Sequence, residues 1–291
     1  VIVSGRADET VRVWDAVTGT PIGEPSTHRT GLVRSVAVGQ LDGRPVIVSG
    51  RADETVRVWD AVTGTPIGQP FTGHTGSVRS VAVGQVDGRP VIVSGSTDET
   101  VRVWDAATGT PIGDPFTGHT DAVFSVAVGQ VDGRPVIVSG RADGAVRVWD
   151  AVTGTPIGEP FTHRTGLVRS VVVGQVDGRP IVVSGGDDET VWVWDAATGT
   201  PIGQPFTGHT GGVNAVAVGQ VDGRPVVVSG GDDETVWVWD AATGTPIGQP
   251  FTGHTGGVNA VAVGQVDGRP VVVSGGDDET VWVWDAATGT P

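Results

Sequence analysis

The chain contains no cysteine, methionine, lysine or tyrosine, and only three leucines among its 291 residues. Without cysteine it can form no disulfide, no zinc site with thiolate ligands and no thiol nucleophile. No apolar run approaches the ~18–20 residues that a membrane-spanning helix needs. No secretory segment with a charged and an apolar region opens the sequence. We therefore expect a soluble, cytoplasmic protein with no cofactor and no metal.

Positive charge is also scarce. All 18 basic residues are arginines, and 33 acidic residues give a formal net charge of −15. This negative charge disfavours non-specific binding of the chain to nucleic acid or to an anionic membrane. We expect neither of these as a partner.

What the sequence does contain is a repeat. The dipeptide Trp-Asp recurs at intervals of 45 residues throughout the chain. Six full repeats (1–45, 46–90, 91–135, 136–180, 181–225 and 226–270) precede a partial seventh at 271–291. Such self-similarity is the signature of one small unit copied along the chain. We expect residues 1–291 to form a single domain of these units.

Within a repeat the side chains alternate with a period of two residues, which predicts strands rather than helices. In the repeat 73–117 the predicted strands are 78–83, 91–94, 100–104 and 112–117. Asp87-Gly88 is a hairpin signal between the first two. Pro115 places the fourth strand at a sheet edge, because proline cannot donate to a central ladder. Four such strands cannot bury their faces alone, so each unit must pack against its neighbours.

Gly73-His74, then Ser94, Asp98 and Trp104-Asp105, resembles the motif of the WD-repeat β-propeller family, and the pattern covers the whole chain. The resemblance implies an all-β propeller of four-stranded antiparallel blades, whose strands a to d run outward from the centre. We expect seven blades with incomplete terminal blades, one lacking its inner strand and the other its outer strand. Similar bacterial WD arrays form the sensor part of larger proteins, and we expect this chain to belong to a longer protein too.

The family resemblance also implies a structural tetrad of His, Ser, Asp and Trp in each blade. Its donor and acceptor groups can satisfy one another in a chain from Trp to Ser to His to Asp. A nucleophilic triad is the alternative interpretation, but several buried copies and the lack of a Gly-x-Ser-x-Gly turn argue against an enzyme. The predicted tetrads are His74/Ser94/Asp98/Trp104, His119/Ser139/Asp143/Trp149, His209/Ser229/Asp233/Trp239 and His254/Ser274/Asp278/Trp284.

Two repeats depart from this motif, because Arg29 and Arg164 stand where the others have the tetrad histidine. Arginine accepts no hydrogen bond and cannot relay between serine and aspartate. We expect these two blades to be rewired, with each arginine paired directly to Asp53 or Asp188.

The resemblance further implies a partner-binding face, formed by the start of strand a and by the residue before the tetrad aspartate. One predicted sector of this face combines arginine with apolar side chains, and we expect Arg6, Arg51 and Arg141 to lie nearby. The opposite sector combines asparagine with acid. The arginine/apolar sector is Leu32, Arg34, Arg79, Phe124, Leu167 and Arg169, and the other is Asn214, Asn259, Asp187, Asp232 and Asp277.

The charge of the chain is divided in the same way. Residues 1–180 hold 16 arginines and 19 acids (−3), whereas residues 181–291 hold 2 arginines and 14 acids (−12). Arginine and aromatic side chains are favoured anchors of protein interfaces. We therefore predict a non-catalytic, monomeric scaffold or sensor that binds a protein through the arginine/apolar sector. Duplication of one acidic repeat could produce the same polarity without a function.

Trp192, Trp237 and Trp282 replace an arginine found at the same place in other repeats, and they leave an alternative open. They could stack on sugars, so a glycan or small ligand could bind there or in the central channel. Packing between blades is the simpler interpretation. The acidic triplets, such as 187–189, lack the spacing of a calcium loop.

Overall fold

The computed structural model describes residues 1–5, 9–27, 31–163 and 165–291, and divides into two compact units. The first unit is Val1–Gly129, Arg134–Arg141 and Trp149–Ile157; the second is Gln130–Gly133, Ala142–Val148 and Gly158–Pro291. The described residues form small antiparallel sheets, seven in all. In this part of the chain no helix is long and apolar enough to cross a membrane.

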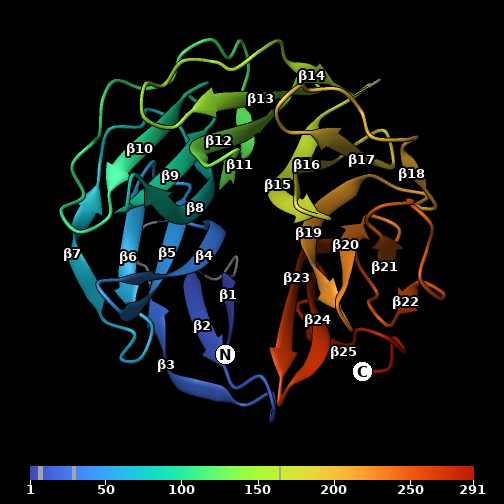
Figure 1. Ribbon diagram of the computed structural model, residues 1–291. Coiled ribbons are helices and arrows are strands. Elements are labelled where there is room, and N and C mark those ends of the chain that lie inside the picture. The colour runs from blue at the N-terminus through green and yellow to red at the C-terminus, as the bar shows by residue number, and fades with distance from the viewer. Residues whose placement is uncertain (6–8, 28–30, 164) are drawn as a thin grey trace. The chain divides into compact units, whose positions relative to one another are not determined.

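Three sheets lie wholly in the first unit (Figure 1). Their strands are β1 (Ile2–Gly5), β2 (Thr10–Trp14) and β3 (Pro21–Thr27); β4 (Val33–Leu41), β5 (Arg44–Arg51), β6 (Val56–Asp60) and β7 (Pro66–Phe71); and β8 (Val78–Val86), β9 (Arg89–Ser96) and β10 (Val101–Asp105). A fourth sheet contains β11 (Val123–Val131), β12 (Arg134–Arg141), β13 (Ala145–Asp150) and β14 (Phe161–Thr162).

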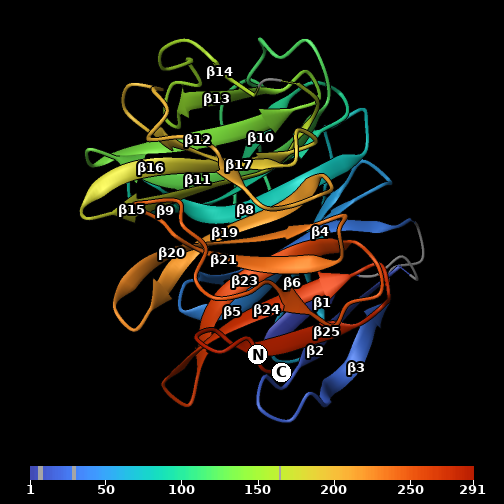
Figure 2. The same ribbon diagram turned by 90° about the vertical axis from the view of Figure 1, so that its right-hand side faces the viewer.

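Three sheets lie wholly in the second unit, and Figure 2 shows β19, β20 and β21 of one of them side by side. Their strands are β15 (Val168–Val176), β16 (Arg179–Gly186), β17 (Thr190–Asp195) and β18 (Phe206–Thr207); β19 (Val213–Val221), β20 (Arg224–Gly231), β21 (Thr235–Asp240) and β22 (Phe251–Thr252); and β23 (Val258–Val266), β24 (Arg269–Gly276) and β25 (Val281–Asp285).

The predicted strands and their order are confirmed, and the fold is an all-β propeller with seven blades, most of them four-stranded. The first sheet lacks a counterpart of β4 and the last lacks a counterpart of β7, as expected for incomplete terminal blades. One departure concerns the blade of β8–β10, where the predicted strand 112–117 pairs only through the bridges Val101↔Phe116 and Trp104↔Pro111. Prolines at the equivalent places, Pro66 and Pro70, are part of the six-residue strand β7, so proline alone does not cause this difference.

The turns follow from local residue chemistry. Asp87 and Gly88 have φ values of 50° and 75° and close a two-residue hairpin between β8 and β9, with Val86 opposite Arg89. Two positive φ values define the turn that suits the twist of a hairpin. The aspartate of each Trp-Asp pair shapes a second turn: Asp60 Oδ1 accepts hydrogen bonds from the backbone N–H groups of Val62 at 2.9 Å and Thr63 at 2.8 Å.

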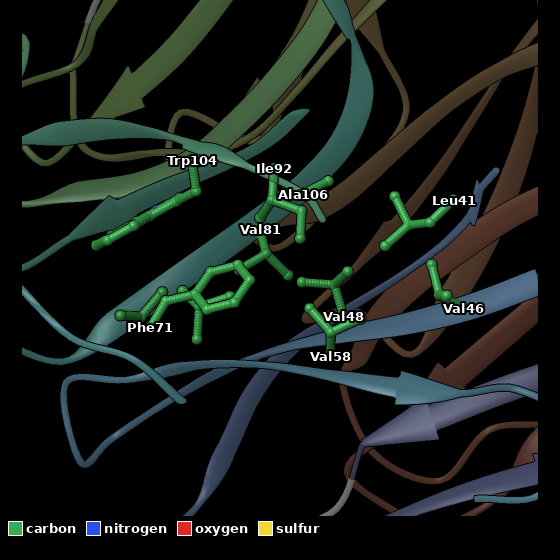
Figure 3. Packing of buried hydrophobic residues seen from close by; sticks show 11 residues of the cluster. Leu41, Val46, Val48, Val58, Phe71, Val81, Ile92, Trp104 and Ala106 are labelled. Carbon is green, nitrogen blue, oxygen red and sulfur yellow. The ribbon is translucent and has the colours of Figure 1, made fainter. Parts of the chain in front are cut away.

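The core lies between successive sheets. Figure 3 shows Val81, Ile92 and Trp104 of one blade facing Val48, Val58 and Phe71 of the preceding blade. The ring centroids of Phe71 and Trp104 are 5.8 Å apart. Glycine permits the close approach of the sheets, because a Cβ atom at Gly95 would lie only 2.6 Å from Cγ1 of Val123. Neighbouring blades therefore bury each other's β-branched strands, as the size of one repeat requires.

Candidate functional site

The structure contains the hydrogen-bonded chain expected of a structural tetrad. The Trp104 indole N–H donates to Ser94 Oγ at 2.8 Å, and Ser94 Oγ lies 2.7 Å from His74 Nε2. His74 Nδ1 lies 2.7 Å from Asp98 Oδ2. Because Ser94 accepts from the indole, its one hydroxyl proton is free to donate to Nε2 of a neutral His74, which places the ring proton on Nδ1 toward the carboxylate.

Other repeats contain the same chain. The two Trp–Ser bonds of Trp239 with Ser229 and of Trp284 with Ser274 are both 2.8 Å long. The histidines, His209 and His254, connect these serines to Asp233 and Asp278.

In the blade of β11–β14, Trp149 donates to Ser139 at 2.8 Å and Ser139 lies 3.0 Å from His119. Asp143 of the same blade accepts a hydrogen bond from the backbone N–H of Ala145 at 3.0 Å.

The expectation of a rewired blade is wrong for the repeat that contains Arg164. His163, one position earlier in the sequence, lies 2.7 Å from Ser184 Oγ through Nε2 and 3.2 Å from the Asp188 carboxylate through Nδ1. Trp194 completes this tetrad with a bond of 2.8 Å to Ser184. His163 therefore takes the role that His74 has in its own blade, although it aligns in the sequence with Gly73. The sequence signal for this was His163 itself, directly before Arg164.

Arg164 itself lies outside the described residues, as do His28 and Arg29 of the other exceptional repeat. In that repeat the described bond is the one from Trp59 Nε1 to Ser49 Oγ, at 3.0 Å.

The Ser94–His74–Asp98 group has the residue types of a nucleophilic triad, but its serine is buried and already hydrogen-bonded. Ser94 is fully buried, with 0% exposure, and its hydroxyl is already bound to Trp104 and His74. A nucleophile must be able to reach a reacting atom of the substrate. Ser94 therefore acts as the hub of a buried network.

The network also stabilises the charged form of its aspartate. Burial raises the pKa of Asp98, but hydrogen bonds from His74, from the Thr100 hydroxyl and from the Thr75 backbone N–H outweigh it, so the pKa lies below its ordinary value. The pKa values of Asp188, Asp233 and Asp278 are lowered by the same kinds of bond against the same opposing burial. Burial lowers the pKa of His209 below its ordinary value, against the opposing effect of Asp233.

We expect the protein to lose stability as the pH falls. An aspartate with a lowered pKa in the fold contributes stability above its unfolded pKa of 3.8 and loses it as pH falls through the folded pKa. His209, with a folded pKa below 6.5, favours its neutral form in the fold, so its contribution is present above 6.5 and is also lost on acidification. Both effects have the same sign.

The measurement is urea unfolding at about pH 7.5, 6 and 4, with the free energy of unfolding expected to fall at each step. The net charge of −15 has the opposite effect, because protonation relieves repulsion. About 1 M NaCl, where the Debye length is about 3 Å, suppresses that contribution. A free energy of unfolding that rises from pH 7.5 to 4 in this salt would contradict the prediction.

The three extra tryptophans stack on the tetrad tryptophans. Ring centroids of Trp237 and Trp239 are 5.0 Å apart with planes 15° from parallel, and Trp192 and Trp282 show the same stacking on Trp194 and Trp284. One face of each indole is thereby covered by protein. Trp192 also lines an open pocket of about 510 Å³, with Asp187, Asp188, Glu189, Thr165, Thr190, Pro205 and Thr207.

The predicted partner-binding positions of the second unit form a hydrogen-bonded network. Arg169 Nε binds Asp187 Oδ1, and its NH1 group donates to Asn214 Oδ1 at 3.0 Å. Asn214 in turn donates to Asp232 at 2.7 Å. Arg169 is therefore paired with the acidic sector rather than with the arginine/apolar sector, because the residue before the tetrad aspartate in its own repeat is acidic.

The other predicted positions of this unit behave in the same way. Asn259 donates to Asp277 at 2.6 Å, and Leu167, half-buried, donates its backbone N–H to Asp187 at 3.3 Å.

In the first unit the corresponding positions hold Arg34, Arg79 and Phe124 on the inner strands of three successive blades. Side-chain hydrogen bonds align these strands: Ser35 Oγ accepts from the backbone N–H of Val81 at 3.2 Å, and Ser80 Oγ accepts from that of Val126 at 3.0 Å.

The aligned side chains meet at one surface. The guanidinium carbon of Arg79 lies 5.3 Å from the Phe124 ring centroid, within cation–π range. Burial and the charge of Arg34 lower the pKa of Arg79. Among the described residues, no carboxylate lies within 4.0 Å of Arg34 or Arg79. Leu32, half-buried, precedes Arg34 and accepts a backbone hydrogen bond from Ala52 at 3.0 Å.

Two other arginines expected near this face are buried instead. Arg51 has 0% exposure and lies 3.2 Å from the Asp53 carboxylate, while Arg141 has 2% exposure and donates to Thr120 at 2.6 Å. Both stand at the end of a strand b, where the side chain turns inward toward the tetrad. The third, Arg6, lies outside the described residues.

Comparison with known proteins agrees with this geometry. The family model "WD domain, G-beta repeat" matches residues 19–60, 64–105, 109–150, 154–195, 199–240 and 244–285. A search of curated proteins finds no match. Among solved structures, the chain is similar to the computationally designed Ika8 protein, with 33% identity over 90% of this chain and 73% of that one and a TM-score of 0.64. With six matched repeats across most of its length, the chain belongs to the WD40 repeat family.

Proposed function

We propose that this chain is a non-catalytic protein-interaction module that binds its partner through the surface of Arg34, Arg79 and Phe124. WD40 propellers generally mediate protein interactions. The observation that supports this particular surface is the pair of arginines with no carboxylate of the described residues beside them. Arginine next to an aromatic ring is the composition of an interface anchor.

The remaining predicted residues have supporting roles in this proposal. Leu32 would extend the apolar part of the surface beside Arg34. Arg169 would contribute less to partner binding than Arg34 and Arg79, because its guanidinium group is already hydrogen-bonded to Asp187 and Asn214. The residues of the acidic sector, with Leu167, would form a separate part of the same partner-binding face: Asn214, Asn259, Asp187, Asp232 and Asp277. We also propose, from the unbroken 45-residue period, that residues 1–291 act as one monomeric domain.

The proposal predicts that Arg34→Glu/Arg79→Glu abolishes capture of a specific protein from lysate of the source cells. Reversing two charges at an interface removes attraction and adds repulsion, which costs several kcal/mol. The control is Arg89→Glu/Arg134→Glu, which makes the same charge change at exposed hairpin turns and also breaks the ion pair of Arg89 with Asp105. Circular dichroism checks that both variants fold. Equal capture by both variants and the unmodified chain would contradict the proposal.

Glycan binding is the second candidate, and the pocket beside Trp192 is the observation that favours it. Stacking on Trp194 leaves only one face of the Trp192 indole for a sugar, whose hydroxyls could bind the carboxylates of Asp187 and Glu189. The arrangement serves packing equally well, so we rank glycan binding second.

A further inference from the structure

The residue before the tetrad aspartate decides whether the neighbouring strand arginine is neutralised. In the second unit this residue is Asp187, eighteen positions after Arg169, and the two side chains are paired. The corresponding residues for Arg34 and Arg79 are Ala52 and Thr97. The same position on the blade therefore carries an arginine paired with a carboxylate in one unit, and in the other two arginines that pair with no carboxylate of the described residues.

These two arginines stand on neighbouring, aligned strands, and Arg79 lies beside an aromatic ring. Arg34 is exposed and Arg79 half-buried, and Arg79 packs over Phe124. The positive charge of Arg34 acts on Arg79 and, with burial, lowers its pKa. An incoming carboxylate would pair with the guanidinium groups and relieve the repulsion between them.

We propose that this surface recognises an acidic peptide, whose carboxylates bind Arg34 and Arg79 as Asp187 binds Arg169, while an apolar side chain packs on Phe124. The inference rests on the proposed function and specifies the chemistry of the partner. Carboxylates suit the guanidinium groups because arginine pairs with them bidentately.

The test places a carboxylate of the protein itself beside each of the two arginines, so that they can no longer bind a carboxylate of a peptide. Ala52→Asp/Thr97→Asp reproduces at both arginines the arrangement that the chain already uses at Arg169. The probe is a fluorescein-labelled peptide of alternating glutamate and leucine, and the comparison peptide has glutamine in place of glutamate. By fluorescence anisotropy at low salt, we expect the unmodified protein to bind the glutamate peptide at least about tenfold more tightly than the glutamine peptide, and the variant to lose at least about tenfold in affinity.

The matched control is Gln40→Glu/Gln85→Glu, which adds the same two negative charges to exposed positions at the other end of β4 and β8. This control should keep at least half of the affinity. An equal loss in both variants would show that only net charge matters and would overturn the proposal. Equal binding of the two peptides, or no binding of either, would also overturn it.

Two further results separate this inference from the proposed function. If Arg34→Glu/Arg79→Glu loses a captured protein but the glutamate peptide does not bind, the proposed function stands and the acidic-peptide inference fails. If sedimentation shows a dimer that Ala52→Asp/Thr97→Asp dissociates, the occupant is the acidic sector of a second copy, and the peptide proposal is overturned.

Discussion

Ser94→Ala is expected to lower the free energy of unfolding by about 2–5 kcal/mol. The substitution removes the hub of a tetrad and leaves the Trp104 indole N–H and His74 Nε2 buried without partners. Each buried group left unsatisfied costs about 1–3 kcal/mol, and alanine adds no compensating contact. Urea unfolding followed by tryptophan fluorescence measures the loss.

The same repeat offers a matched control for this prediction. Ser77 is a second serine whose hydroxyl is buried, and it has no hydrogen-bond partner among the described residues. Ser77→Ala removes the same atom without breaking a bond, so its effect on unfolding should stay within about 0.5 kcal/mol. Similar losses in the two variants would mean that the tetrad hydrogen bonds contribute nothing beyond the volume of the serine.

Trp239→Ala is expected to cost about 3–5 kcal/mol of stability. Trp239 has 1% exposure and packs against Trp237 on one side and Phe206 on another, with centroids 5.0 and 5.6 Å away. Its removal leaves a cavity between two blades and frees the Ser229 hydroxyl from its indole donor. Chemical unfolding gives the total cost, and hydrogen exchange of β20–β22 shows whether the loss is local.

Trp237→Arg is the comparison for this prediction. The chain itself carries arginine at the equivalent positions 57, 102 and 147, so the blade accommodates both side chains. The indole N–H of Trp237 is buried and has no hydrogen-bond partner in the described part of the structure, and no bond is lost on replacement. We expect a cost below about 1 kcal/mol. If Trp237→Arg costs as much as Trp239→Ala, the stacked tryptophans are a structural requirement of their blades rather than one of two interchangeable fillings.

The sequence predicted the strands because the relevant signals are local and repeated. Alternation placed a strand at 78–83, and the structure extends it to Val86, where Asp87-Gly88 turns the chain. Pro115 indicated an edge strand at 112–117, and the structure reduces that strand to two bridges. Each of these features depends on residues close together in the chain.

The errors concern side chains whose environment depends on residues far apart in the sequence. His163 stands one position earlier in its repeat than the tetrad histidine of the other repeats. Its place in the tetrad is evident only from its distances to Ser184 and Asp188. The burial of Arg51 depends on its approach to Asp53 across a turn. The pairing of Arg169 depends on Asp187, on a different segment of the same blade, and on Asn214 of the next. Charge counts could not distinguish an occupied arginine from an unoccupied one.

The central claim is that this WD40 chain binds a protein through Arg34, Arg79 and Phe124. Its most direct test is quantitative mass spectrometry of proteins captured by three baits: the unmodified chain, Arg34→Glu/Arg79→Glu and Arg89→Glu/Arg134→Glu. We expect at least one protein whose capture falls about tenfold or more with the first variant and is unchanged with the second. Identical sets of captured proteins in equal amounts from all three baits would contradict it.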